Sequence, residues 1–170
     1  KLKIAFLYAK TPATSAWTYA HELGRLHLEQ TFPEEVTTEC YVNLTRDLAE
    51  KAIADAIQKG CNIIFTTTPE FVQASVQAAI AHPEVKILNC SLNTSHRYIR
   101  TYYARMYEAK FLMGAIAGAM AENGQLAYIA DYPIFGTIAN INAFALGAKM
   151  VNPRAQVYLE WSTLKDVDLG

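Results

Sequence analysis

The strongest constraint on the fold is a regular alternation between short apolar runs and longer segments of helical periodicity. The apolar runs KIAFLYA, TTECYVN, NIIFTTT, KILNCSL, RTYYARMY, QLAYIAD and VYLEWS are rich in β-branched and aromatic residues. Such alternation is typical of βαβ units, whose strands are nearly continuous apolar runs because helices cover both faces of a parallel sheet. The sequence therefore predicts the α/β fold class, with a parallel sheet flanked by helices.

Turn-forming residues support these boundaries. Gly60 follows a helix predicted to end at Lys59, where a glycine in the left-handed conformation commonly terminates a helix. Pro69 stands where the first turn of the next helix would tolerate its missing N–H. The helix before Gly60 should bury one narrow apolar stripe, made up of Ala49, Ala52, Ile53, Ala56 and Ile57.

Asn123 and Gly124 separate a long helix from a new strand, which predicts two lobes at residues 1–124 and 125–170. The first lobe contains a nearly complete set of strands and helices. The second contains only strand, helix and strand, which is too few elements to cover its apolar surface. We therefore expect a partial second lobe whose helix face around Ile138, Ile141 and Phe144 drives self-association.

Composition excludes some classes of partner. The 170 residues are 52% hydrophobic and 18% charged, with a formal net charge of −1, as in an ordinary globular protein. This balance gives no electrostatic basis for binding nucleic acid or an anionic membrane. The apolar stretch at residues 111–121 is far shorter than the roughly 20 residues that a membrane-spanning helix needs.

The motifs of catalysis and cofactor binding are not apparent. The loop after the first strand lacks the glycines that cradle phosphate, and no G-x-S-x-G sequence occurs. His21 and His27 do not have the one-turn spacing of a zinc pair. Cys40, Cys61 and Cys90 form no C-x-x-C pair and are expected to be buried free thiols. We expect neither a cofactor nor a metal, and a binding protein rather than an enzyme.

The candidate site follows from the sheet. In open α/β sheets ligands bind beyond the carboxyl ends of the strands. Trp17 belongs to the loop and helix start after the first strand, and side chains in that first turn point back over the strand ends. Its ring could pack in the core or could form a platform for a planar ligand. The segments expected at this edge are 10–17, 66–70, 91–93, 131–135 and 161–162.

Longer motifs carry a family resemblance. The segments SAWTYAHELGR, NIIFTTT, TYYARMYEAKFLMGAIAG and PIFGTIANINAFALGAKMVNP follow one another along essentially the whole chain. Together they resemble the basic membrane protein family, the PnrA-like substrate-binding lipoproteins of ABC importers. The resemblance implies a type I periplasmic-binding-protein fold that holds a purine nucleoside or purine base between two lobes. It also implies a small-molecule ligand and an ABC permease as partners.

The resemblance further implies which residues contact the ligand. An aromatic residue at the start of the first helix stacks on the base in this family, and Trp17 occupies that position. Taken together with the strand-end segments, the expected ligand-binding residues are Trp17, Thr18, Thr67, Thr68, Tyr103, Arg105, Asp131, Tyr132 and Asn140. By analogy with the fold, Tyr103 and Arg105 should line the cleft while Tyr107 packs inside.

The sequence also departs from the family pattern. Thr18 replaces a frequent Asn, Pro69 and Glu70 replace an aromatic-glycine pair, and Gln73 replaces a frequent acidic residue. These differences concern which polar edge of a base is recognised and whether ribose is required. Family members also continue well beyond the last residue of this chain, so we expect it to comprise the first lobe and the opening of the second.

Two other function classes remain open. The same two-lobed clamp can serve as the ligand-sensing domain of a signalling or transcription regulator, which would be cytoplasmic. An enzyme acting on a nucleoside is the third alternative. The importer interpretation implies an extracytoplasmic protein, either periplasmic or lipid-anchored, and predicts a leader segment upstream of the first residue, Lys1.

Overall fold

The computed structural model describes residues 1–91, 97–130 and 135–162. It contains two compact units, Lys1–Tyr103 and Ala104–Gly170, each described here by itself. The elements of the first unit are β1 (Leu2–Leu7), α1 (Ala16–Thr31), β2 (Val36–Tyr41), α2 (Arg46–Gln58), β3 (Ile63–Thr66), η1 (Pro69–Phe71), α3 (Val72–Ala81), β4 (Lys86–Cys90) and β5 (Arg100–Tyr102). Those of the second are α4 (Met106–Met120), β6 (Gln125–Ala130), α5 (Phe135–Val151) and β7 (Gln156–Trp161).

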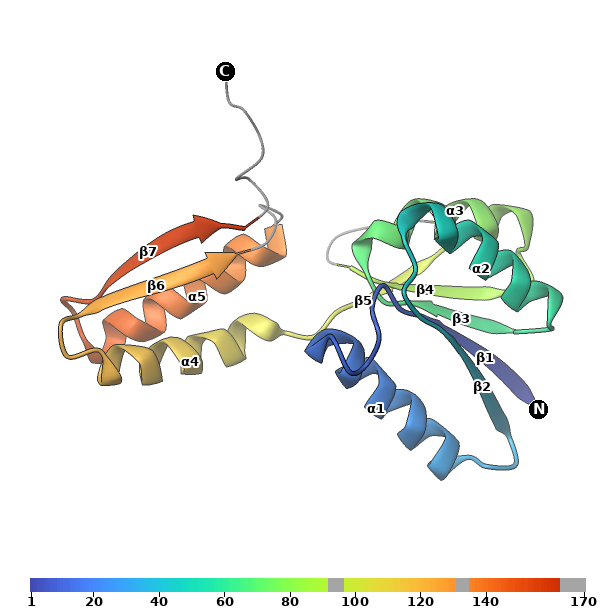
Figure 1. Ribbon diagram of the computed structural model, residues 1–170, viewed down its shortest axis with the longest axis horizontal. Coiled ribbons are helices and arrows are strands. Elements are labelled where there is room, and N and C mark those ends of the chain that lie inside the picture. The colour runs from blue at the N-terminus through green and yellow to red at the C-terminus, as the bar shows by residue number, and fades with distance from the viewer. Residues whose placement is uncertain (92–96, 131–134, 163–170) are drawn as a thin grey trace, which may run out of the picture. The chain divides into compact units, whose positions relative to one another are not determined.

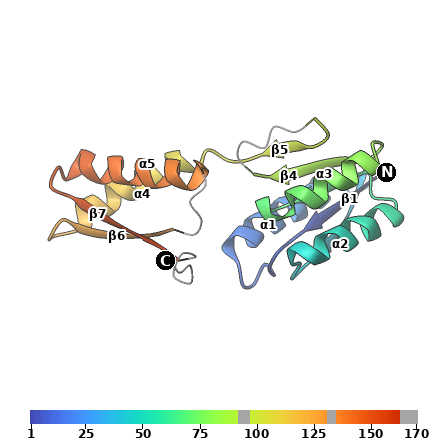
Figure 2. The same cartoon turned by 90° about the horizontal axis from the view of Figure 1, so that it is seen from above.

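The first unit is a five-stranded parallel sheet in the order β2-β1-β3-β4-β5, which confirms the predicted α/β class. Helices α2 and α3 cover one face and α1 covers the other (Figures 1 and 2). Alternate residues of β1 serve the two faces: Ala5 and Leu7 pack with α2 and α3, whereas Ile4 and Phe6 belong to the core beside α1. Because the strands are parallel, their carboxyl ends share one edge of the sheet.

Local signals in the sequence correctly placed the ends of several helices. Gly60 has φ +84° and follows α2, and its N–H donates to the carbonyl oxygen of Ile57, which terminates the helix. Pro69 opens η1, a 3-10 turn that leads directly into α3. Ala49, Ala52, Ile53 and Ala56 form the buried stripe predicted for α2, with Ile57 packed partly against the same core.

The second unit pairs β6 and β7 in parallel and packs α4 tightly against α5. Gly114 and Gly147 bring the two backbones together: a Cβ added to Gly114 would lie 1.9 Å from the carbonyl oxygen of Phe144. A Cβ on Gly147 would lie 2.0 Å from the carbonyl oxygen of Phe111. Gly118, four residues after Gly114 on α4, also lies close to α5, since a Cβ there would lie 2.6 Å from the carbonyl oxygen of Ala148.

The division between units falls between Tyr103 and Ala104, earlier than the boundary after Gly124 that the sequence predicted. The difference is α4, which the sequence assigned to the first lobe but which packs on α5 of the second unit. Another difference concerns Cys40, which was expected to be buried. It is exposed because it lies on β2, an edge strand, whereas Cys61 and Cys90 are buried as predicted.

The prediction that the apolar face around Ile138, Ile141 and Phe144 is uncovered was wrong for two of these residues. Ile141 and Phe144 are each only 9% exposed, because the inner face of α5 packs on α4 and β6. Ile138 is 40% exposed. The large apolar side chains that do remain exposed on these two helices include Leu112, Met113, Ile116 and Met120 of α4 and Leu146 and Met150 of α5.

Candidate ligand-binding site

Trp17 lies in the first turn of α1 and is held at its nitrogen. Ser15 caps this helix by accepting a hydrogen bond from the backbone N–H of Thr18, at 3.2 Å. The Nε1–H of Trp17 donates to the carbonyl oxygen of Thr67, 2.7 Å away. The Trp17 side chain is nevertheless 39% exposed. One edge of the indole is thus fixed to the end of β3 while part of the ring stays accessible.

Aromatic rings surround Trp17 within the first unit. The Tyr103 ring centroid lies 6.0 Å from that of Trp17, with the planes tilted by 36°. The His21 ring lies 5.2 Å from Trp17 and 6.0 Å from Tyr102. His21 and Trp17 are one turn apart on α1, which places both rings on the same face of the helix. The cluster provides stacking surface rather than a charged pocket.

The His21 ring has a defined tautomer in its neutral form. Its Nδ1 lies 2.9 Å from the carbonyl oxygen of Trp17. Because a carbonyl oxygen only accepts, Nδ1 carries the hydrogen and Nε2 is left as an acceptor. His21 therefore adds one polar group to an otherwise aromatic cluster.

The threonines predicted to bind the ligand are mostly engaged within the protein. Thr67 is 1% exposed, and both its hydroxyl and its N–H donate to the carbonyl oxygen of Leu7, at 2.8 and 3.2 Å. Thr18 is 2% exposed. Thr68 caps η1 by accepting from the N–H of Glu70 at 3.4 Å. Thr67 therefore contributes to the proposed site through its carbonyl group, which accepts a hydrogen bond from Trp17.

The remaining predicted residues belong to the second unit. Arg105 is exposed, and its guanidinium contacts Glu108 at 2.6 Å and the hydroxyl of Tyr107 at 2.9 Å. Asn140 is half-buried on α5. Asp131 and Tyr132 lie outside the described residues. The ligand-binding roles of these four residues stay predictions.

Tyr107 does not pack inside as expected. Its side chain is 41% exposed. The reason is its place in the first turn of α4, where the Arg105 guanidinium lies 5.6 Å from the Tyr107 ring centroid. This local pair holds the tyrosine at the surface.

A residue at this edge that the sequence did not identify is Asn89. It is fully buried at the carboxyl end of β4, and its side-chain NH2 donates to Thr66 Oγ1 at 2.8 Å and to the carbonyl oxygen of Thr68 at 2.9 Å. The available signal was a lone amide inside the apolar run KILNCSL. The NH2 group of Asn89 is satisfied by these bonds, whereas its Oδ1 has no hydrogen-bond partner among the described residues. Because most buried amides are hydrogen-bonded, an asparagine in a central strand indicates a specific polar partner.

Two groups beside the aromatic cluster, Cys90 and Tyr102, are held in their neutral forms. Burial raises the pKa of the Cys90 thiol to about 11 and raises the pKa of the neighbouring Tyr102 phenol above its usual range. A thiol with such a pKa is not a thiolate at neutral pH, and the thiolate is the nucleophilic form. Cys90 is therefore no candidate nucleophile.

Beneath the cluster, an ion pair anchors α1 to the sheet. Arg25 contacts Glu22 at 2.6 Å, and the buried Tyr8 hydroxyl donates to the same carboxylate at 3.0 Å. The Arg25 guanidinium is the main reason that the pKa of Glu22 lies below its usual value. Glu22 is one residue beyond His21, so this network fixes the helix that carries Trp17.

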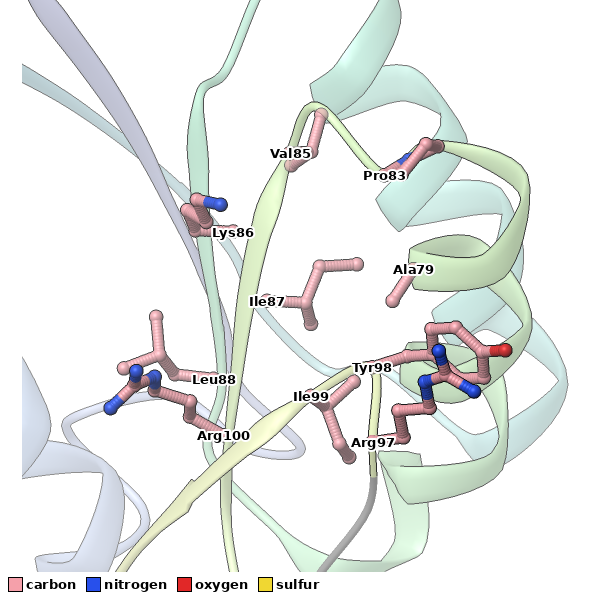
Figure 3. A pocket seen from close by; sticks show the side chains of 10 residues that line it. All are labelled: Ala79, Pro83, Val85, Lys86, Ile87, Leu88, Arg97, Tyr98, Ile99 and Arg100. Carbon is pink, nitrogen blue, oxygen red and sulfur yellow. The ribbon is translucent and has the colours of Figure 1, made fainter.

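A hollow in the first unit lies away from this edge. Its volume is about 510 Å³, and its lining includes Val85, Lys86 and the segment Arg97–Arg100, at the amino ends of β4 and β5. Figure 3 shows Arg100 and Leu88 on one side of β4 and Arg97, Tyr98 and Ala79 on the other. Its charged groups do not converge, and Arg97 lies against the ring of Tyr98 at 5.8 Å. In open α/β sheets, ligands bind at the carboxyl ends of the strands, which is the opposite edge of the sheet.

Within the described ranges, no cluster of three or more His, Cys, Asp or Glu side chains is arranged to hold a metal ion. Among the helices in the same ranges, none combines the length and apolar character required to cross a membrane.

The sequence matches a known family from its first residue to its last. The model of the PnrA-like family of ABC transporter substrate-binding proteins matches residues 1–170. The chain belongs to this family. Its members are substrate-binding proteins of transporters.

Relatives of this PnrA-like chain differ in the ligands for which they are named. A purine-binding protein of Brucella abortus is 32% identical over 95% of this chain and 46% of its own length. A putative ABC transporter glucose-binding protein of Haloferax volcanii is 26% identical over 92% of this chain and 40% of its own length. The chain thus spans less than half the length of these curated relatives.

Solved structures confirm the fold. An ABC transporter solute-binding protein from Aeropyrum pernix superposes with a TM-score of 0.75 over 96% of this chain and 48% of the other, at 15% identity. The predicted type I periplasmic-binding-protein architecture is therefore correct, with this PnrA-like chain covering part of it.

Proposed function

We propose that the protein is the extracytoplasmic solute-binding component of an ABC importer and that its ligand is a purine nucleoside or purine base. The observation that carries this proposal is the fixed but accessible indole of Trp17, at the carboxyl edge of the sheet and beside Tyr103. A planar base stacked there gains apolar burial together with ring stacking. The purine-binding relative from Brucella abortus supports the same ligand class.

Glucose is the competing ligand, because one relative is named for it and an indole face can also pack against a sugar ring. The aromatic cluster favours the purine, since it offers several rings but few polar groups to satisfy sugar hydroxyls. Thr68, Tyr103 and the Nε2 of His21 are the groups we expect to recognise the edge of the base. Roles for Thr18, Thr67, Arg105, Asp131, Tyr132 and Asn140 form part of the same proposal.

The proposal is tested by calorimetric titration with adenine, adenosine, guanosine and glucose, preceded by mass spectrometry of any ligand that copurifies. Saturable binding of a purine with no heat from glucose is the expected result. Binding of glucose alone would reject the purine assignment while leaving the transporter family intact. The permease partner and the periplasmic or lipid-anchored location are tested by co-purification and by cell fractionation.

A further inference from the structure

Three fully buried polar side chains form a hydrogen-bonded group where β3, β4 and α3 meet. Asn89 donates to Thr66 Oγ1 at 2.8 Å, and that oxygen lies 2.9 Å from Ser75 Oγ. Ser75 in turn donates to the carbonyl oxygen of Phe71 at 2.7 Å. All three side chains are 0% exposed. Buried polar groups are costly unless paired, so the bonds of these three side chains restrict their geometry, although Oδ1 of Asn89 has no partner among the described residues.

The orientation of the Asn89 amide follows from its partners. The amide nitrogen lies 2.9 Å from the carbonyl oxygen of Thr68, which can only accept. Rotating the amide by half a turn would place two acceptors against each other. The NH2 group of Asn89 must therefore face the connection between β3 and η1.

That connection also holds Trp17. Thr68 directly follows Thr67, whose carbonyl oxygen accepts from the indole Nε1–H at 2.7 Å. The other side of Thr67 is tied to Leu7 of β1 through its N–H and its hydroxyl. The carbonyl group of Thr67 thus lies between two anchors, Leu7 on one side and Asn89 on the other.

We propose that Asn89 is a positioning residue for the ligand platform, because it fixes the Thr67–Thr68 backbone to which the Trp17 indole is bonded. The relevance of this role to affinity rests on the proposed function, in which Trp17 stacks on a purine. The role itself concerns only the first unit and can be measured without any ligand.

The experiment uses a Trp161→Phe background, in which Trp17 is the only tryptophan left of the two in the chain. Asn89→Asp keeps the size of the side chain but directs an acceptor at Thr68. Ser75→Ala is the matched control, because Ser75 is equally buried and contacts Phe71 and Thr66 but neither Thr67 nor Thr68. Asn89→Ala removes the donor without adding charge, and it replaces the Asp variant in the experiment if that variant does not fold.

Two readouts are taken: Trp17 emission with acrylamide quenching in the absence of ligand, and purine affinity by calorimetry. The Asn89 variants should increase quenching of Trp17 and weaken purine binding about tenfold or more. Ser75→Ala should lower the melting temperature but leave both readouts as in the background protein. Unchanged Trp17 emission and quenching in the folded Asn89 variants would overturn the proposal. Altered emission with unchanged purine affinity would uphold the positioning role and reject the stacking role of Trp17.

Discussion

The indole nitrogen of Trp17 and the carbonyl oxygen of Thr67 lie 2.7 Å apart, so the first turn of α1 is bonded to the end of β3. These residues are far apart in sequence, and the bond fixes the edge of the ring rather than its faces. A ring held in this way needs little ordering when a flat ligand arrives. Binding sites gain affinity from such preorganisation because less conformational entropy is lost.

Substitution of Trp17 separates stacking from core packing. Trp17→Ala should weaken purine binding by about one to two orders of magnitude, equivalent to the loss of ~1–3 kcal/mol of base stacking. Trp17→Phe keeps a ring for stacking but loses the donor to Thr67, so its affinity should fall between that of the parent protein and that of Trp17→Ala. Calorimetric titration and thermal melts measure both effects. A loss of ~3–5 kcal/mol in stability with unaltered affinity would instead identify Trp17 as a core residue.

Gly114 is predicted to be essential for the pairing of α4 with α5. In Gly114→Ala the new Cβ would lie 1.9 Å from the carbonyl oxygen of Phe144, so the helices must move apart. We expect a loss of about 3 kcal/mol or more in unfolding free energy, as for severe overpacking. Gly24→Ala is the control, because the added methyl group on α1 has no neighbour within 4 Å. It should gain about 0.5–1 kcal/mol from helix propensity. Equal melting temperatures for the two variants would contradict the close packing.

Local chemistry explains what the sequence predicted well. The end of α2 and the start of η1 follow from residues with restricted or unusual backbone preferences, Gly60 and Pro69, whose effects do not depend on distant partners. The order of strands and helices follows from apolar periodicity in the same way. The sequence also placed Trp17 at a helix start after the first strand, and it lies in the first turn of α1, which Ser15 caps.

Long-range partners explain what the sequence missed. Nothing near α4 in the chain indicates that it packs on α5, so the unit boundary was placed after Gly124 instead of after Tyr103. Likewise the exposure of Cys40 depends on the edge position of β2 in the sheet. The bonds from Trp17 to Thr67 and from Asn89 to Thr68 join separate strands and helices, and no local pattern encodes them.

The exposed apolar face of the second unit is predicted to drive self-association of this chain. Met120 and Ile116 of α4 are 75% and 60% exposed, and Leu146 of α5 is 63% exposed. Exposed apolar side chains on neighbouring helices favour protein–protein contact when they gather into one patch. Ile116→Glu should shift the chain toward monomer in light scattering across concentrations. Gln30→Glu, which adds the same charge at an exposed position of α1, should leave the association unchanged. A strictly monomeric parent chain would refute the prediction.

The Glu22–Arg25 pair is predicted to make stability depend on acid pH. The Arg25 guanidinium lowers the pKa of Glu22 in the folded protein below its usual value, so folding favours the carboxylate. The resulting stability is fully present above the pKa of the unfolded state, about 4.3 for Glu, and is lost as pH falls through the folded pKa.

Glu22→Gln removes the charge while leaving a side chain of similar size. It should cost about 1–3 kcal/mol at pH 7, because Arg25 and the Tyr8 hydroxyl lose their charged partner. As the pH falls below the usual range of a glutamate, the stability of the parent protein should approach that of the variant. Denaturant titrations at a series of pH values measure this convergence, with the exposed Glu50→Gln on α2 as control. A difference between parent and Glu22→Gln that stays constant down to the acid transition would show that the pair does not control the pH dependence, since protonating Glu22 abolishes the interaction that the substitution removes.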